Sequence, residues 1–546
     1  MDRAHTPVTA ITHSAISGKP VYVETENERR RKFRRIVDAA LSPACDNVWD
    51  HARSQNRNSM AGIVARLLEN YLSGRVDNRD PNSALLAGYA NTINIWVGSM
   101  VNPVDEPVLY EPIQQLFLFC AIPIAAYFHR NTRNQGQHRL LLPVDRTNFS
   151  PRGSNSATRP DVVICACSRN SLVALQANNH YSTFDVIVEV KAREEGLEEV
   201  VGQHAMYTSY LLANRPDRSY VWGLIVTRTL VYTLIYGHDV IWVSEPANIA
   251  TRDGRRTLVQ LIVDWSLCPA EHFGMNPAIH FHARDGNNNI IYHIDVSGTR
   301  YFAKCAQQSA QLMGDRKRRF DAWPTSNTNG LPPYTIDSSH PYLTRERRGI
   351  SRSESDLLWT IHNIVHDHRR AFPEPLASAQ IGHHMMTGRN DGSNLYELAF
   401  SRLEAFPPTP ARGEHDWCEV RRRANWLLLT DSVGTVISAA NNSNQVIVAI
   451  ADAMRAHDQL FNDARILHRG ISDSNICFRG VGGDLAGILS GFGDAIMVAD
   501  EHRTRPDMAI IRAIQPILSL VSTRAPRTRL DDWECLLYLV ICLGTY

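Results

Sequence analysis

The chain has 546 residues, of which 44% are hydrophobic and 21% are charged. Single domains usually contain about 100–200 residues, so this length predicts more than one core. Lys and Arg total 57 and Asp and Glu total 56, which gives a formal net charge of +1. This balance excludes a chain-wide field that would attract nucleic acid or anionic lipid, so any such binding requires a local patch.

The sequence has no feature of a secreted or membrane-spanning protein. Residues 1–19 lack the apolar segment of a secretory signal, and the ten Cys residues form no C-x-x-C pair that would indicate zinc or a disulfide framework. The most apolar run, residues 116–128, is too short to span a bilayer and is interpreted as a buried helix. We therefore expect a soluble intracellular protein, cytoplasmic or nuclear, with no membrane partner.

Two basic clusters, residues 29–35 and 316–319, interrupt the otherwise mixed charge pattern. Runs of like charge are usually solvated faces, so both are expected at the surface with little effect on folding. For residues 29–35, a nuclear address or a nucleic-acid contact is the alternative.

Apolar periodicity predicts a mixed α/β domain in the first half of the chain. A polar extension covers residues 1–75 and ends in a helix, and the α/β domain is expected over residues 76–305. Its predicted helices are residues 111–128 and 194–214, and its predicted strands are residues 161–167, 184–191 and 220–227, with further strand pattern over 231–244 and a closing hairpin over 278–304. The second half, residues 306–546, is predicted to be mostly helical, with a short strand at 426–430.

Two carboxylates and a lysine fall at the ends of neighbouring predicted strands. Asp161 begins one strand, and Glu189 and Lys191 close the next on one face because side chains alternate along a strand. Carboxylates that hold Mg²⁺ beside a lysine suit metal-dependent phosphodiester cleavage. The alternative is that Asp161 caps a turn and that Glu189 and Lys191 form a strand-end pair exposed to water.

This arrangement resembles the restriction-endonuclease-like fold, also called PD-(D/E)-x-K. The resemblance implies a metal site at Asp161, Glu189 and Lys191, and it extends to Gln203 on the following helix and Glu111 on the preceding one. It also implies that nucleic acid is a candidate partner of this domain.

Residues 466–476 have the spacing of a kinase catalytic loop, H-R-D-x-x-x-x-N. His468 and Arg469 open the loop and Asn475 keeps the place of the metal-binding asparagine, but Gly470 stands at the catalytic aspartate. Further on, Gly491 replaces the aspartate of a D-F-G turn. Both substitutions remove carboxylates that the transfer of phosphate requires.

The order of these motifs is similar to that of the fungal-type protein kinase family. Other matches are the R-T and M-A-I motifs within residues 503–510 and the run that starts with Asp532, Trp533 and Glu534. The resemblance covers residues 155–546 and implies an α+β bilobal kinase domain that uses ATP and Mg²⁺, preceded by a restriction-endonuclease-like region. Because the chain stops soon after Asp532, we expect a truncated C lobe.

The predicted N lobe departs from the family at its phosphate-binding positions. Asp337 follows the Y-x-I pattern where the lysine is expected, and Glu354 is its partner on the C helix. Lys304 is the rival lysine, but it lies much farther from Glu354 in the sequence. Gly314 is a single glycine where several backbone N–H groups should wrap the phosphates.

Three functions stay open at this point. The first is a degenerate kinase, or pseudokinase, that binds or organises a protein partner; the second is an active atypical Ser/Thr kinase with a protein substrate; the third is a Mg²⁺-dependent nuclease-fold protein. An active kinase would need Asp473 and Asp494 as substitute carboxylates. The candidate catalytic residues are His468, Arg469, Asp473 and Asn475, and the candidate nucleotide-binding residues are Gly314, Glu354 and Asp494. Retention of Asn475 without its aspartate companions favours the first function.

Overall fold

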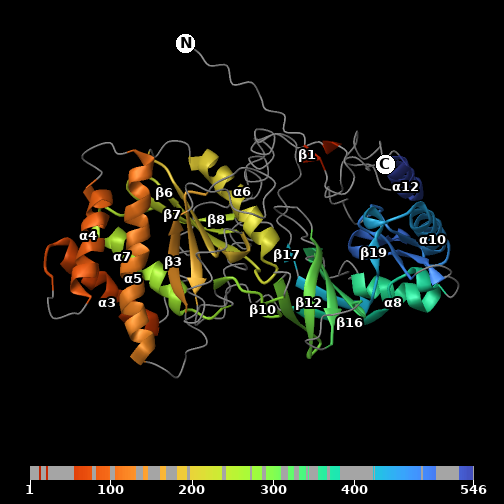
Figure 1. Ribbon diagram of the computed structural model, residues 1–546, viewed down its shortest axis with the longest axis horizontal. Helices are drawn as coiled ribbons and strands as arrows, with labels where there is room; N and C mark the ends of the chain where they lie inside the picture. The colour runs from red at the N-terminus through yellow and green to blue at the C-terminus, as the bar shows by residue number, and fades with distance from the viewer. Residues whose placement is uncertain are drawn as a thin grey trace, which may run out of the picture. The chain divides into compact units, whose positions relative to one another are not determined.

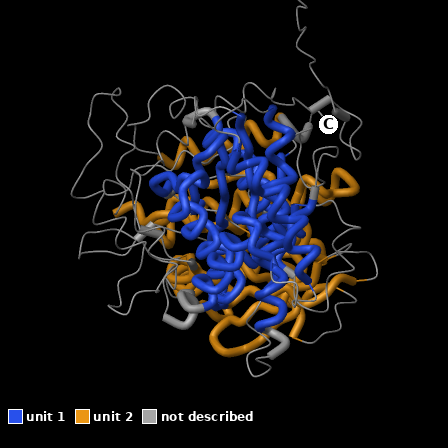
Figure 2. Tube along the Cα trace, turned by 90° about the vertical axis from the view of Figure 1, so that its left-hand side faces the viewer, with its two compact units in different colours: residues 1–13, 20–277, 384–420 blue, residues 14–19, 278–383, 421–546 orange. Residues whose placement is uncertain are grey.

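The chain divides into two compact units, each made of three segments of the sequence. Unit 1 contains residues 1–13, 20–277 and 384–420, and unit 2 contains residues 14–19, 278–383 and 421–546 (Figure 2). The computed structural model describes residues 12–13, 20–21, 55–76, 82–98, 105–130, 139–145, 160–167, 181–192, 197–236, 241–270, 273–285, 290–308, 318–324, 331–339, 342–343, 354–365, 369–381, 422–423, 425–480, 484–499 and 528–544. The basic cluster at residues 29–35 and Gly314 lie outside the described residues.

Unit 1 is built on a mixed sheet with the strand order β3-β4-β5-β6-β7-β8. The strands are β3 (Leu140–Asp145), β4 (Val162–Cys167), β5 (Val186–Val190), β6 (Val221–Val226), β7 (Leu230–Tyr236) and β8 (Ile241–Val243), and the short β9 (Ala247–Asn248) pairs with β7. Only β5 and β6 run parallel among these described strands, joined by helix α6 (Leu197–Asn214). Both are buried along their whole length, which explains why their sequences are apolar apart from Glu189 and Gly223.

Helices cover both faces of this sheet. Helices α3 (Gln55–Leu72), α4 (Ser83–Gly98), α5 (Tyr110–Arg130) and α7 (Arg252–Leu267) share one apolar core with the sheet, and Figure 1 shows them on the side opposite α6. The segment Glu106–Tyr127, which includes most of α5, is by length and composition apolar enough to cross a membrane, but half of that window is buried in the protein. Leu116 and Phe117 of α5 lie in the core, as predicted for a buried helix.

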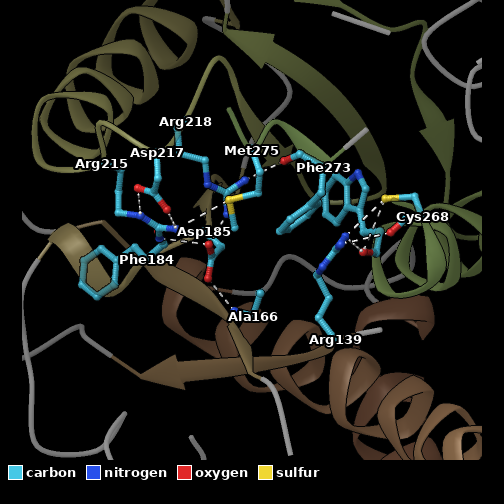
Figure 3. A network of polar contacts seen from close by, with 11 residues as sticks. Arg139, Ala166, Phe184, Asp185, Arg215, Asp217, Arg218, Cys268, Phe273 and Met275 are labelled. Atoms are coloured by element: carbon cyan, nitrogen blue, oxygen red, sulfur yellow. Dashed lines mark hydrogen bonds and ion pairs between the residues drawn. The ribbon is translucent and has the colours of Figure 1, made fainter. Parts of the chain in front are cut away.

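A buried ionic network fixes the start of β5 in unit 1 (Figure 3). Asp185 accepts hydrogen bonds from Ala166 N at 2.6 Å and from Arg215 Nη1 at 3.0 Å, and it also pairs with Arg218. Arg215 donates two further bonds of 2.8 Å to Asp217. Buried charges are tolerated only when they are paired and hydrogen-bonded, so these four charged groups depend on one another.

Phe273 extends this network to the end of α7. The guanidinium groups of Arg218 and Arg139 lie 4.7 and 4.6 Å from the centroid of its ring. Arg139 donates to Trp265 O at 2.7 Å and to Cys268 O at 3.0 Å. Arg139 therefore satisfies carbonyl groups at the C-terminus of α7, and both arginines pack on the ring of Phe273.

Unit 2 contains an antiparallel sheet with the order β10-β11-β12-β13-β14-β18-β16. Its strands are β10 (Ile279–Arg284), β11 (Ile290–Val296), β12 (Thr299–Gln308), β13 (Arg318–Trp323), β14 (Tyr334–Ser339), β16 (Pro375–Ile381) and β18 (Asn425–Asp431). The boundary expected near residue 305 falls inside β12, because residues 278–304 join this sheet instead of closing unit 1. The expectation of a mostly helical second half is wrong for the described part, since charged residues within β13 and β14 obscure the strand pattern.

The rest of unit 2 combines helices with short strand pairs. The helices are α8 (Glu354–Ile364), α10 (Ser443–Asn462) and α12 (Arg529–Gly544), and the short strands are β19 (Thr435–Val436), β20 (Ile466–Leu467), β21 (Ile476–Arg479), β22 (Ala486–Leu489) and β23 (Ile496–Met497). One further pair in unit 2 is β15 (Tyr342–Leu343) with β17 (Arg422–Arg423), whereas β1 (Thr12–His13) pairs with β2 (Pro20–Val21) in unit 1. The register of β21 on β22 pairs Ile476 with Leu489, which brings the loop 468–475 beside the turn 490–494.

Candidate functional site

The predicted catalytic loop is anchored by a buried carboxylate on α12. Asp532 accepts hydrogen bonds from His468 N at 3.1 Å and from Arg469 N at 3.0 Å, and His457 Nε2 lies 3.0 Å from Asp532 Oδ2. Burial opposes the negative charge, but the histidines and the backbone bond hold the pKa of Asp532 below its ordinary value. Arg469 has a φ of 61°, so these bonds hold a non-glycine residue in a left-handed conformation.

His468 links the loop to the turn that follows β22. Gly470 N donates to His468 Nδ1 at 3.2 Å, so the ring carries its proton on Nε2, which lies 3.1 Å from Ser490 O. The ring also meets Phe492 edge-on, with centroids 4.9 Å apart. These contacts place His468 and Arg469 as supports of the loop.

Asn475 turns into the space between the two glycines that replace aspartates. Its Nδ2 donates to Gly470 O at 2.6 Å, and a Cβ added at Gly491 would lie 2.2 Å from its Oδ1. Ser490 N donates to Asn475 O at 2.8 Å, which fixes the backbone of this residue. Asp473 is half-buried, and the side chain of Asp494 lies outside the described residues.

Glu354, the predicted partner on the C helix, is the first residue of α8. Its Oε1 accepts a hydrogen bond of 2.6 Å from Phe492 N. The rival Lys304 lies elsewhere on the sheet, where its Nζ is 3.0 Å from Asp285 Oδ2 and packs near the Trp323 ring. Glu354 therefore supports the turn at Gly491, and Lys304 does not take part in this site.

Arg318 and Arg319 are buried, so the expectation that residues 316–319 form a surface run is wrong for these two. Arg319 Nε donates to Asp337 Oδ1 at 3.0 Å across the β13–β14 pair. Its Nη2 donates to Ser490 Oγ at 3.1 Å. Arg319 is not solvated, because it finds the carboxylate of Asp337 on the next strand.

The predicted cluster in unit 1 also forms. Lys191 Nζ lies 2.8 Å from Glu189 Oε1 and 3.9 Å from Asp161 Oδ2, and Val190 N donates to Asp161 Oδ2 at 2.8 Å. Glu189 is fully buried, so the alternative of a pair exposed to water is wrong for this residue. Burial and the charge of Asp161 raise the pKa of Glu189 to about 8.

Glu106, which the sequence analysis did not identify, completes this cluster in place of Glu111. Glu106 lies in the short 3₁₀-helix Glu106–Leu109 and is 3.6 Å from Lys191 Nζ, whereas Glu111 is exposed on the first turn of α5. Tyr110 donates to Glu106 Oε1 at 3.1 Å and to Asp161 Oδ1 at 3.0 Å. Burial and these carboxylates raise the pKa of Tyr110, so it stays a donor at neutral pH.

The polar groups of the cluster are not all satisfied. Glu189 Oε2 is buried and has no hydrogen-bond partner. Gln203 donates to Tyr207 OH at 2.9 Å. Among the described residues, no group of three or more His, Cys, Asp or Glu side chains is arranged to hold a metal ion. The cation at this place is the ammonium of Lys191.

Comparison with known proteins bears on both sites. The family described as Fungal protein kinase matches residues 159–315 and 362–510, which is more than half of the chain. The matched segments contain Asp161, Glu189 and Lys191 as well as the loop from His468 to Asn475. No curated protein matches the sequence. The chain belongs to the fungal protein kinase family.

Proposed function

We propose that unit 2 is a degenerate kinase that binds a protein partner and does not transfer phosphate. Phosphoryl transfer depends on a carboxylate that holds Mg²⁺, a base for the substrate hydroxyl and a cation on the phosphates. Gly491 and Gly470 supply neither a metal ligand nor a base through a side chain. Arg319 carries a positive charge, but Asp337 and Ser490 already bind its guanidinium.

The position of Asn475 carries this proposal. Its amide nitrogen bonds to Gly470 O and its oxygen lies 2.2 Å from where a Cβ on residue 491 would be, so a carboxylate side chain at position 491 would collide with Asn475. ATP and Mg²⁺ are the ligands that the family implies. The bond to Gly470 O uses the Asn475 nitrogen, so its oxygen could still meet a metal, but Gly470 and Gly491 would add no side-chain ligand.

A phosphotransfer assay tests the proposal on purified full-length chain. Radiolabelled ATP is supplied with Mg²⁺ or Mn²⁺, with casein as substrate, and a melting curve is recorded with and without Mg-ATP. We expect no transfer and no shift in melting temperature. Transfer that disappears in Asp473→Ala or Asp494→Ala would show that a substitute carboxylate rescues the site and would overturn the proposal.

We propose as a second function that unit 1 is a restriction-endonuclease-like domain that binds Mg²⁺ and nucleic acid. The orphaned, fully buried Glu189 Oε2 favours this function, because Mg²⁺ needs only one or two carboxylates when water completes its coordination. Asp161 and Glu189 would hold the ion, which would polarise a phosphate, and Lys191 would stabilise the developing charge.

Metal binding to unit 1 is tested by titrating the full chain with Mn²⁺ while its melting temperature is followed. We expect an increase that is absent in Asp161→Asn and unchanged in Glu111→Gln, whose exposed carboxylate lies outside the cluster. Binding to DNA or RNA is measured at several salt concentrations. No thermal shift at millimolar metal would refute the metal site.

A further inference from the structure

Arg319 points from the sheet of unit 2 toward its helical part. Strand register places Arg319 opposite Asp337, and Asp337 opposite Leu428 on β18, so the three side chains share one face of the sheet. Leu428 belongs to the apolar core that includes residues of α8, α10 and α12. The guanidinium of Arg319 therefore enters the same side of the sheet as the loop 468–475.

The guanidinium bonds to both segments that frame the catalytic-loop position. Nη1 donates to Ser474 O at 3.4 Å and to Cys477 Sγ at 3.5 Å, and Nη2 donates to Ser490 Oγ at 3.1 Å. Ser490 Oγ in turn donates to Asn475 O at 3.1 Å. One side chain on β13 thus joins the sheet to the residues on either side of the β21–β22 hairpin.

A buried cation of this kind requires local compensation. Only 9% of the Arg319 side chain is exposed, and its Nε–Asp337 Oδ1 bond of 3.0 Å supplies the compensating charge. Burial alone would disfavour the positive charge, but Asp337, with a further contribution from Glu354, raises the pKa of Arg319. The guanidinium is therefore charged and bound by protein groups without any ligand.

We infer that Arg319 is a positioning residue that ties the sheet of unit 2 to the loop 468–475 and the turn at Gly491. A lysine is expected at position 337 on β14, but Asp337 stands there, and the cation is Arg319 on β13. This inference rests on the proposed function, because a cation held by Asp337, Ser474 and Ser490 is not free to bind a triphosphate. The unit keeps its loop in place with an internal cation.

Hydrogen exchange of the full chain tests the inference. In Arg319→Met, amides of residues 468–479 and 486–491 are expected to exchange about tenfold faster or more, because hydrogen bonds from a charged donor are lost. Arg319→Lys keeps the charge but has fewer fixed donors, so an intermediate increase is expected. The matched control is Lys304→Met on β12, whose cation pairs with Asp285 and should leave these amides unchanged. If Arg319→Met does not fold, Arg319→Lys provides the same comparison.

A fluorescent ATP analogue, with Mg²⁺, is titrated into the same variants to separate this inference from the proposed function. No binding by the wild type together with faster exchange in Arg319→Met supports both. Binding by the wild type with faster exchange in Arg319→Met supports the inference, and the phosphotransfer assay then decides whether the proposed function fails. Unchanged exchange in Arg319→Met and Arg319→Lys overturns the inference, and loss of analogue binding in those variants would then identify Arg319 as a phosphate ligand.

Discussion

Asn475 stands where a side chain at position 491 would begin: a Cβ on Gly491 would lie 2.2 Å from Asn475 Oδ1. Gly491 also has a φ of 80°, a conformation that other residues rarely adopt. The missing aspartate and the inward turn of the Asn475 amide toward Gly470 O are therefore coupled. An aspartate restored at position 491 alone would not recreate a metal site, because Asn475 would have to move first.

Gly491→Ala is expected to destabilise the protein by about 2–5 kcal/mol. Left-handed backbone contributes about 1–2 kcal/mol of this, and overpacking against Asn475 contributes about 1–3 kcal/mol. Gly298→Ala is the matched control, because Gly298 has a φ of 83° but no atom within 4 Å of an added Cβ. Chemical denaturation of both variants measures the difference. Equal losses of stability in the two variants would show that Asn475 moves aside freely. In the double variant with Asn475→Ala and Gly491→Ala, the share of the loss that comes from overpacking should disappear.

The carboxylate of Asp185 is expected to be essential to unit 1. Asp185→Asn leaves Arg215 and Arg218 buried without their shared charge, and breaking a buried pair in this way typically costs about 3–5 kcal/mol. Asp253→Asn is the matched control, since it makes the same chemical change at an exposed residue of the same unit. Denaturant unfolding should show a large loss for the first variant and less than about 1 kcal/mol for the second. A small loss for Asp185→Asn would mean that water reaches the two arginines.

Because of Glu189, unit 1 is expected to become less stable as the pH rises. Its pKa rises from 4.5 to about 8 on folding, so the folded protein binds one more proton between these values. The contribution of Glu189 to the free energy of unfolding is therefore fully present below about pH 4.5, and it is lost as the pH rises through about 8. Glu189→Gln should remove this decline in urea unfolding of the full chain between pH 5 and pH 9. Glu111→Gln, at an exposed carboxylate, should keep it; an unchanged slope in Glu189→Gln would assign the decline to another group.

Alternation along a strand was sufficient to predict most of the cluster in unit 1. Glu189 and Lys191 share a face because β5 has a period of two, and the approach of Asp161 follows from the pairing of β4 with β5. Glu106 could not be predicted in the same way, because its place depends on how the short helix before α5 packs on the sheet. Glu111 satisfied the sequence pattern but points to solvent.

Arg319 shows a different limit of sequence reasoning. A basic run is usually solvated, and nothing local to residues 316–319 indicates burial. The sequence did contain one signal far from this run. Asp337 stands where a lysine is expected, and a carboxylate at that position favours a cation on the neighbouring strand. The ionic network at Asp185 could not be predicted for the same reason, since Arg215 and Arg218 follow α6 whereas Asp185 directly precedes β5.

Asp532 is expected to control the stability of the loop at His468. Its two carboxylate oxygens accept hydrogen bonds from the backbone N–H groups of His468 and Arg469. In Asp532→Asn only one oxygen is left to accept, and the new NH2 group would face these N–H donors. We expect a loss of about 3 kcal/mol or more in unfolding free energy, with faster hydrogen exchange at residues 468–470. The folded pKa of Asp532 is depressed, so its contribution is present above the unfolded pKa of about 3.9 and is lost as the pH falls through the lower folded value. The difference between wild type and variant should therefore shrink in acid.

Asp531→Asn provides the matched control on the same helix. Asp531 is also buried, but its carboxylate accepts from Thr528 Oγ1 at 2.9 Å and does not bond to the loop. Loss of a cap of this kind costs about 0.5–2 kcal/mol and should leave exchange at residues 468–470 unchanged. Equal exchange in Asp531→Asn and Asp532→Asn would show that both variants act by loosening α12 as a whole. Faster exchange confined to Asp532→Asn would show that the carboxylate holds the loop directly, with Arg469 kept in its left-handed conformation by that bond.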